Sequence, residues 1–207
     1  MVLTSGFYES EVIEALRGEL RPGAVLWDIG ANFGLVAVTA ARLEGAAQVV
    51  AFEPNRTEFR RLARHAAMNR CRIGLANCAL SDVSGKMAFQ PGPAQNSGMG
   101  RLGNDPDPRF GFQEQVPVAT GDGLIQDGLQ PAPTVVKIDV EGHELRALQG
   151  MAHALAHPRC RLVVFEDARD TASPVQALLR ELGFEISPLE RREATHHPLE
   201  NLAARKR

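Results

Sequence analysis

One stretch of the sequence decides the fold: Val25-Leu26-Trp27-Asp28-Ile29-Gly30-Ala31-Asn32-Phe33-Gly34. An apolar strand ends in an acidic residue and enters a tight turn with two glycines, and an alanine-rich helix begins straight after it. Glycines in such a turn let the backbone approach a ligand closely and adopt conformations that a Cβ would forbid. The start of the following helix presents free N–H groups to a polar or anionic ligand. The stretch therefore predicts a strand–turn–helix unit that holds a ligand.

Outward from this unit, short apolar runs rich in β-branched residues alternate with helical stretches. This alternation is typical of an α/β fold with a mostly parallel sheet and helices on both faces. A chain of 207 residues suffices for one domain with a sizeable core, so we expect a single domain over residues 1–207 that opens with a helical segment at 1–23. The expected strands are 24–28, 48–52, 72–77, 134–139, 161–166, 184–189 and 201–203, and the expected helices are 9–20, 35–43, 56–69, 143–156 and 174–182.

The middle of the chain breaks the alternation. Residues 91–112 are dense in Gly, Pro, Asn and Asp with little periodicity, which predicts a long loop. Loops of that length inside a compact domain are often lids or binding loops, so this one is a candidate substrate lid. The segments that flank it, 86–90 and 113–119, are expected to pair as a small antiparallel excursion.

Composition narrows the function classes. The formal charge of -2, from 23 basic and 25 acidic residues, gives no sign of a nucleic-acid partner, and the basic residues 204–207 are expected to form a solvated tail. The 3 cysteines lack the spacing of zinc sites or disulfide frameworks and are expected to be reduced thiols at or near the core. No apolar run is long enough to span a bilayer, and the first residues do not resemble a signal peptide. We expect a cytoplasmic protein without a membrane partner, and the composition leaves a homodimer open.

Two cofactors are compatible with the glycine turn. A dinucleotide would need the G-x-G-x-x-G fingerprint, which the spacing of Gly30 and Gly34 does not match. The negative charge of Asp28 disfavours a pyrophosphate at the turn but favours the ammonium group of a methionine moiety. Glu53 ends the second strand, where a carboxylate can hold the two hydroxyls of a ribose. The charge pattern therefore favours S-adenosylmethionine.

A second charged cluster, VVKIDVEGHE at residues 135–144, ends another apolar strand. Lys137 and Asp139 share one face of that strand because side chains alternate with a period of two. Buried charges at a strand end are costly unless they pair with each other or with a ligand. Glu141 and Glu144 are explained by the positive end of the helix that follows. Lys137 and Asp139 are not, which favours a functional role for this pair.

At these residues the sequence resembles the FkbM-type methyltransferase family. The resemblance rests on KIDVEGHE at 137–144 with Leu145, Leu148 and Gly150 after it, on DIGANFG at 28–34, on FEPN at 52–55 and on ALSD at 79–82. GFYE at 6–9 and NSG at 96–98 match less specifically. The motifs occur in the family's order over nearly the whole chain. One departure is Gly121-Asp122, where family members commonly have Leu-Asp.

The resemblance implies a class I methyltransferase fold with a seven-stranded sheet, S-adenosylmethionine as methyl donor, and a hydroxylated small-molecule acceptor such as a sugar or a secondary metabolite. By position, the glycine turn would hold the methionine end of the donor, Glu53 its ribose, and the segment around Leu80 would lie near the adenine. The implied cofactor-binding residues are Asp28, Gly30, Ala31, Asn32, Gly34, Glu53, Pro54, Asn55, Ala79, Leu80 and Ser81. Asp139, with Glu141 and His143 nearby, would face the methyl group and the acceptor.

For catalysis, alignment of acceptor oxygen, methyl carbon and sulfur should account for much of the rate. A hydroxyl also has to lose its proton, and Asp139 and His143 are the candidate bases. Lys137 is expected either to stabilise the alkoxide or to neutralise Asp139. Glu166, at the end of the next strand, is expected to bind acceptor hydroxyls or, with Asp139, a divalent metal. Two carboxylates do not define a ligand set, so no metal site is predicted.

Three rival functions stay open on the sequence alone. A nicotinamide-dependent oxidoreductase would use the same ribose carboxylate, but the missing fingerprint argues against it. A non-catalytic module would bind the cofactor without turnover. A nucleic-acid amino methylase would need the Asn/Asp-Pro-Pro-aromatic motif, which is absent after the fourth strand.

Overall fold

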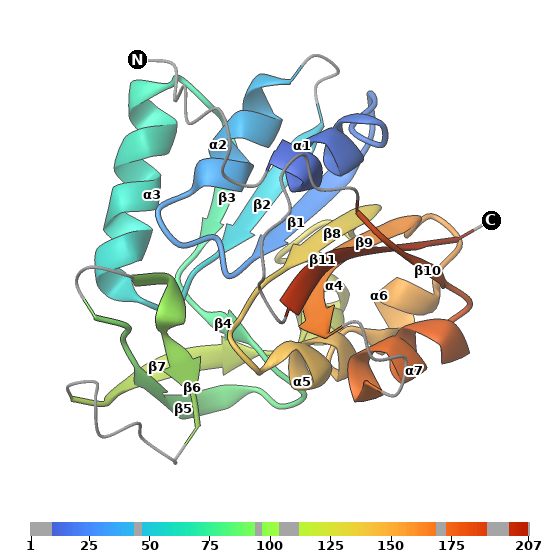
Figure 1. The fold of residues 1–207 in the computed structure, drawn as a ribbon. Coiled ribbons are helices and arrows are strands. Elements are labelled where there is room, and N and C mark those ends of the chain that lie inside the picture. Colours follow the sequence, from blue (N-terminus) through green and yellow to red (C-terminus); the bar gives the residue numbers. More distant parts are fainter. Residues whose placement is uncertain are drawn as a thin grey trace.

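A seven-stranded sheet forms the centre of the computed structural model, which describes residues 10–43, 47–93, 97–103, 112–168, 173–189 and 199–206 (Figure 1). From edge to edge its strands are β10 (Glu185–Pro188), β11 (Leu199–Arg205), β9 (Leu162–Ala168), β8 (Val135–Ile138), β1 (Val25–Ile29), β2 (Gln48–Phe52) and β3 (Ile73–Ala76). β11 runs antiparallel to both of its neighbours, and the pairings from β9 to β3 are parallel. The α/β class and the mostly parallel seven-stranded sheet are thereby confirmed.

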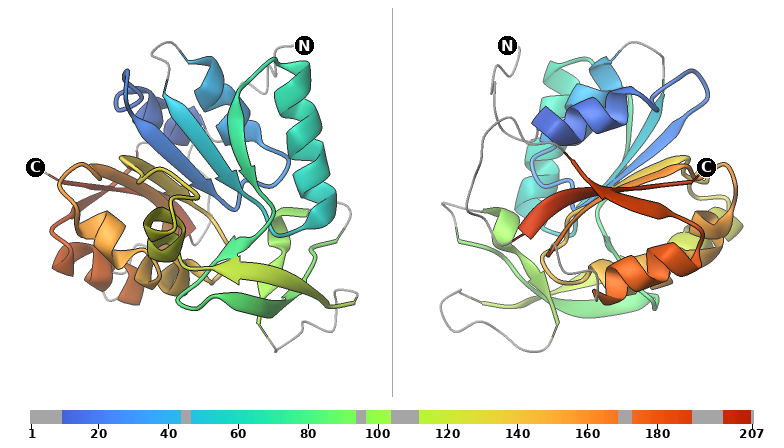
Figure 2. Two further views of the ribbon diagram at one scale, coloured as in Figure 1. Left: turned by 180° about the vertical axis from the view of Figure 1, so that it is seen from behind. Right: turned by 45° about the vertical axis from the view of Figure 1, so that its right-hand side comes forward.

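Helices cover both faces of this sheet (Figure 2). One face carries α1 (Ser10–Arg17), α2 (Leu35–Arg42) and α3 (Arg56–Met68), and the other carries α4 (Gly121–Gln126), α5 (Glu144–Gln149), α6 (Ala152–Ala156) and α7 (Pro174–Glu181). Successive residues of β1 serve the two layers in turn, because side chains alternate along a strand. Leu26 packs in the core under α1–α3, and Trp27 packs with Phe52 and Leu148 in the other core.

A second, four-stranded sheet lies beside the carboxyl ends of β1, β2 and β3 (Figure 2). The order of its strands is β4 (Ala79–Leu80), β7 (Glu114–Ala119), β5 (Gly85–Gln90) and β6 (Arg101–Leu102). Along the chain, the 3-10 turn η1 (Ser97–Met99) lies between β5 and β6. The expected antiparallel pairing of the segments around residues 86–90 and 113–119 is confirmed as β5 with β7. β4, β6 and α4 were not foreseen.

Three expectations are wrong. Residues 91–112 are not simply a loop, because β6 pairs with β5 through Phe89 and Leu102, and backbone pairing overrides the Gly- and Pro-rich composition. The helix expected over 143–156 divides into α5 and α6 at Gly150, where an added Cβ would lie 1.9 Å from the carbonyl oxygen of Ser81. The basic C-terminal residues are not a free tail: Ala204 and Arg205 belong to β11, and the Lys206 ammonium donates to the His157 carbonyl at 3.3 Å.

Several earlier expectations concern segments outside the described residues. These are the motif at 6–9, Asn96, and the parts 94–96 and 104–111 of the central loop. In the described part of the chain all three cysteines are free thiols, with Cys160 buried. Over the same residues, none of the helices combines the length and apolarity that a membrane span requires.

Candidate active site

The glycine turn is shaped by the protein's own packing. Gly30 has a φ of 77°, and a Cβ there would lie 1.9 Å from the carbonyl oxygen of Asp139, so only glycine lets the ends of β1 and β8 come this close. Gly34 has a φ of 90°, and its Cβ would lie 2.3 Å from Leu62 on α3. The N–H groups of Gly30 and Ala31 both donate to the Phe52 carbonyl at 3.0 Å. The turn is therefore fixed between the ends of β8 and β2 and the first turns of α2 and α3.

Glu53 is the centre of a hydrogen-bond cluster beside this turn. Its carboxylate accepts the backbone N–H of Asn32 at 2.8 Å and that of Asn55 at 2.7 Å. The Asn77 side chain donates to the Glu53 carbonyl at 2.8 Å. Burial raises the pKa of Glu53 to about 7, against the opposing effect of the two backbone donors. The second strand thus ends in a nearly enclosed carboxylate whose two oxygens each accept one bond and retain further acceptor capacity.

The residues after Glu53 shape the local backbone. Asn55 caps α3, since its side-chain oxygen accepts from the N–H of Thr57 at 2.9 Å and of Glu58 at 3.4 Å. Pro54 is half-buried, and its carbonyl accepts from Asn77 at 3.1 Å. Asn55 therefore holds the Glu53 carboxylate through its N–H, and Asn77 holds the backbone on either side of Pro54.

Asp28 and Asp139 flank a single cation. The Lys137 ammonium lies 3.5 Å from Asp28 Oδ1, 3.7 Å from Asp139 Oδ2 and 3.4 Å from the Gly30 carbonyl oxygen. Asp28 is fully buried, and within the described residues neither of its carboxylate oxygens accepts a hydrogen bond. Burial raises the pKa of Asp28, and Lys137 opposes the shift. Of the two roles expected for Lys137, this geometry favours neutralising the aspartates.

Past the end of β8, a tight turn carries Glu141 on the surface. Glu141 has a φ of 53° and Gly142 a φ of 94°, and the Glu144 carboxylate holds the turn by accepting from the N–H of Val140 at 3.1 Å and of Gly142 at 3.2 Å. Desolvation and the charges of Asp139 and Glu166 raise the pKa of Glu141 to about 7. These three carboxylates, which we call the acidic rim, therefore gather at the ends of β8 and β9.

His143 lies apart from the acidic rim. It is buried at the start of α5, and its Nε2 lies 2.9 Å from the hydroxyl of Ser81. Burial, assisted by Arg146, lowers the pKa of His143. Ala79, Leu80 and Ser81 are likewise buried, with β4 paired to β7. The structure thus joins His143 to the segment expected near the adenine, and leaves Asp139 with Lys137.

Three residues at the site were not assigned from the sequence. Asn77 could have been found from the sequence, because it directly follows β3, the parallel strand next to β2, and so lies at the same edge as Glu53. Ser97 donates its hydroxyl to Asn32 Oδ1 at 3.1 Å, and Arg101 acts electrostatically on Glu141. Neither the Ser97 bond nor the charge effect of Arg101 has a local sequence signal, because both depend on how distant segments pack together.

No metal centre accompanies these groups in the described part of the chain, where His, Cys, Asp and Glu side chains nowhere gather in threes placed to hold an ion.

Comparison with known proteins shows the family of the chain. Residues 28–186 match the Methyltransferase FkbM domain. The chain belongs to the FkbM methyltransferase family. This family member is an S-adenosylmethionine-dependent methyltransferase, and the rival oxidoreductase is set aside.

Two characterised relatives support the assignment of the FkbM-family chain. The hexuronic acid methyltransferase AglP of Haloferax volcanii is 34% identical over 187 residues, covering 89% of this chain and 74% of its own length. The 31-O-demethyl-FK506 methyltransferase FkbM of Streptomyces tacrolimicus is 32% identical over 196 residues, covering 81% and 75%.

Solved structures show the same fold at much lower identity. The precorrin-6y C5,15-methyltransferase of Geobacter metallireducens superposes with a TM-score of 0.58 and 16% identity, over 96% of this chain and 88% of its own. The magnesium protoporphyrin IX methyltransferase of Synechocystis, crystallised with bound S-adenosylmethionine, gives 0.55 and 13%, over 95% and 79%. At these identities the likeness concerns the fold alone.

The residues at the site fit the donor of the FkbM family. S-adenosylmethionine carries an ammonium, a sulfonium and a ribose but no phosphate. Glu53 offers a carboxylate with spare acceptor capacity, and Asp28 adds a buried carboxylate at the end of β1, 3.5 Å from the Lys137 ammonium. Carboxylate oxygens accept hydrogen bonds, and the ammonium and the ribose hydroxyls of S-adenosylmethionine can donate them.

Replacing Ser97 with alanine is expected to weaken donor binding by roughly three- to tenfold, since one ordinary hydrogen bond is worth about 1 kcal/mol. The lost bond holds Asn32, whose φ of 49° is unusual for a residue with a Cβ and whose N–H serves Glu53. Calorimetry with S-adenosylhomocysteine measures the effect. Ser84→Ala is the matched control, because Ser84 accepts from the Thr120 N–H at 3.2 Å at the other end of β5. Equal affinities in the two variants would mean that Ser97 has no part in shaping the turn.

Proposed function

We propose that this enzyme transfers the methyl group of S-adenosylmethionine to a hydroxyl of a sugar or a sugar-like secondary metabolite. The observation that carries the proposal is the acidic rim beside the glycine turn. Carboxylates attract hydroxyl donors and can accept their protons, whereas they repel an anionic acceptor. By their names, one relative methylates a hexuronic acid and the other places a methyl group on oxygen, which supports a sugar-like acceptor and an oxygen atom. The acidic rim leads us to expect a neutral sugar here in place of a sugar acid.

The donor would be held by the turn and the end of β2. S-adenosylmethionine supplies a methyl group activated on a sulfonium. Glu53 would accept hydrogen bonds from both ribose hydroxyls, and the turn that contains Asn32 would enclose the methionine end. Asp28 and its Lys137 partner would form a buried ion pair at the end of β1. Its burial makes it a fixed electrostatic element, because it cannot rotate into solvent.

Glu141 is the proton acceptor in this proposal. A general base is most effective when its pKa lies near the working pH, and the pKa of Glu141 lies at about 7. Asp139, held 3.7 Å from the Lys137 ammonium, would orient the acceptor hydroxyl. His143 would act as a positioning residue, because its Nε2 is engaged with Ser81.

The segment 97–103 would form the wall over the acceptor. It contacts the glycine turn through Ser97, and the charge of Arg101 opposes the rise in the pKa of Glu141. The balanced charge of -2 favours a small hydroxylated acceptor over nucleic acid. The three free thiols favour a reducing compartment such as the cytoplasm.

The proposal is tested by the kind of methyl group that the enzyme forms. Purified protein is incubated with methyl-labelled S-adenosylmethionine and one of two matched acceptors, a hexose glycoside or the corresponding hexuronic acid glycoside. The masses of the products are measured by mass spectrometry. We expect a gain of one methyl group that survives mild alkali, as an ether does, with the neutral hexose glycoside preferred. A label released by alkali is a methyl ester, and it would show that the acceptor is a carboxylate and not a hydroxyl.

A further inference from the structure

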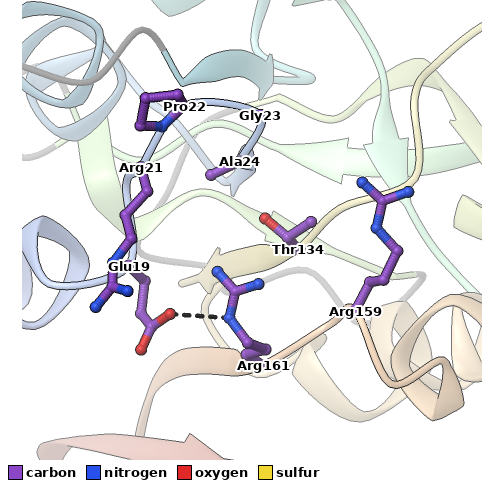
Figure 3. A pocket seen from close by; sticks show the side chains of 8 residues that line it. All are labelled: Glu19, Arg21, Pro22, Gly23, Ala24, Thr134, Arg159 and Arg161. Carbon is purple, nitrogen blue, oxygen red and sulfur yellow. Dashed lines mark hydrogen bonds and ion pairs between the residues drawn. The ribbon is translucent and has the colours of Figure 1, made fainter.

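A hollow of about 630 Å³ opens at the amino-terminal ends of the parallel strands of the central sheet, which we call its amino-terminal edge (Figure 3). It is lined by the turn before β1 and by the residues that lead into β8 and β9. Three arginines, Arg21, Arg159 and Arg161, and one carboxylate, Glu19, are among its lining residues. In Figure 3 the guanidinium groups of Arg159 and Arg161 lie nearest to Thr134, and that of Arg21 points away from it. Small-molecule sites commonly measure 300–1,000 Å³, so the hollow is large enough for a ligand.

This hollow is separate from the candidate active site. Thr134 stands before β8, whereas Asp139 follows its other end, and the two edges are separated by the length of the parallel strands. A five-residue strand such as β1 is about 16 Å long. A small acceptor at the acidic rim therefore cannot reach the arginines through the sheet.

The charges in the hollow leave an excess of cation. The Glu19 carboxylate lies 3.0 Å from Arg161 Nε and so neutralises one of the three arginines. Arg21 donates from Nε to the Gly18 carbonyl at 3.3 Å, a neutral partner. Among the described residues, neither Arg21 nor Arg159 has a carboxylate within ion-pair distance. Arg159 therefore brings an uncompensated guanidinium charge to the hollow, beside the Arg161–Glu19 pair.

The end of the chain adds to this basic edge. Arg205 on β11 pairs in register with Leu162 at the start of β9, and the Lys206 N–H donates to the Arg161 carbonyl at 3.0 Å. Arg205 and Lys206, which the sequence analysis placed in a tail, therefore lie at the same edge as Arg161. The carboxyl edge of the sheet, by contrast, carries the acidic rim. Carboxylates are present at the basic edge too, since Glu185 on β10 lies opposite Arg205 and Glu19 pairs with Arg161.

We propose that the arginine hollow binds a phosphate-bearing ligand at a second site, distinct from the donor and acceptor sites. A guanidinium presents paired N–H donors that match phosphate oxygens, and a phosphate can bridge guanidiniums on different sides. Figure 3 shows the guanidinium groups of Arg159 and Arg161 on either side of Thr134, which suits such bridging. A carboxylate ligand would duplicate the role that Glu19 already has with Arg161.

Inorganic pyrophosphate is the probe for this site, titrated calorimetrically into the full chain. We expect saturable binding that Arg159→Ala weakens by at least about tenfold, since a hydrogen bond to a charged group is worth ~1.5–3 kcal/mol. Arg159 is exposed, so its removal should leave the fold and the affinity for S-adenosylhomocysteine unchanged. Arg60→Ala, an exposed arginine on α3, is the matched control and should bind pyrophosphate as the wild type does.

Two results would overturn the proposal: no saturable binding of pyrophosphate at millimolar concentration, or equal weakening by Arg159→Ala and Arg60→Ala, which would indicate general charge attraction. Where the site is confirmed, flotation with phosphatidylcholine vesicles, with and without phosphatidic acid, distinguishes the source of the phosphate. Retention on the phosphatidic acid vesicles that Arg159→Ala abolishes assigns the site to a lipid headgroup. Absence of retention assigns it to a soluble phosphate ester.

Discussion

Substituting Glu141 with glutamine is expected to lower turnover by about 10²–10⁴-fold, the usual effect of losing a general base. The substitution is nearly isosteric, and the side chain is exposed on a turn whose shape is fixed by Glu144, so the fold and the donor affinity should persist. Glu181→Gln, an exposed carboxylate on α7, is the matched control and should retain wild-type turnover. The comparison is made with whichever acceptor the methylation screen identifies.

The pH profile assigns the proton acceptor. The pKa of Glu141 is raised to about 7, so the carboxyl is protonated below that pH and the rate should fall as pH decreases through 7. Asp139 contributes to this raised pKa through its charge. Asp139→Asn should therefore move the acidic limb of the kcat profile to lower pH, while Glu141→Gln should remove the limb. If the limb disappears in Asp139→Asn and survives in Glu141→Gln, the roles of the two residues are reversed.

The ends of the parallel strands could be predicted from the sequence because one rule governs them. Carboxyl ends of neighbouring parallel strands meet at one edge of the sheet, so an acidic residue that follows each apolar run must lie near the others. Asp28, Glu53 and Asp139 were found in this way, and the alternation along β8 correctly placed Lys137 against Asp139. The period-two pattern carries this information without any knowledge of distant contacts.

The parts that could not be predicted depend on contacts between distant segments. His143 is hydrogen-bonded to Ser81, 62 residues earlier, and no sequence pattern near either residue predicts this bond. Glu141 became a candidate base only when the left-handed turn placed it with Asp139 and Glu166. The break at Gly150 reflects the close approach of the Ser81 backbone. In each case tertiary packing overrides a local preference that the sequence expresses correctly.

Replacing Glu53 with alanine is expected to weaken the binding of S-adenosylhomocysteine by roughly 30-fold, about 2 kcal/mol, because charge-assisted hydrogen bonds to both ribose hydroxyls are lost. The N–H groups of Asn32 and Asn55 also lose their acceptor, so the turn itself should loosen and the thermal midpoint should fall. Glu53→Gln is the control for this loss of packing. It retains one acceptor oxygen, and its affinity should lie between those of alanine and the wild type.

The pH dependence of donor binding separates the charge of Glu53 from its shape. Its pKa is about 7 in the folded chain and 4.5 in the reference state, so the folded protein holds a proton that the unfolded chain releases between these values. The contribution of Glu53 to stability is therefore present below pH 4.5 and is lost as pH rises through 7.

Ribose hydroxyls donate to the ionised carboxylate, so the affinity for S-adenosylhomocysteine should increase as pH rises through 7. Below that pH, binding should release a proton. Calorimetry in two buffers of different ionisation enthalpy measures that release, which Glu53→Gln should abolish. An affinity that is independent of pH in the wild type and unchanged in both variants would remove Glu53 from the donor site and leave its buried carboxylate with a purely structural role.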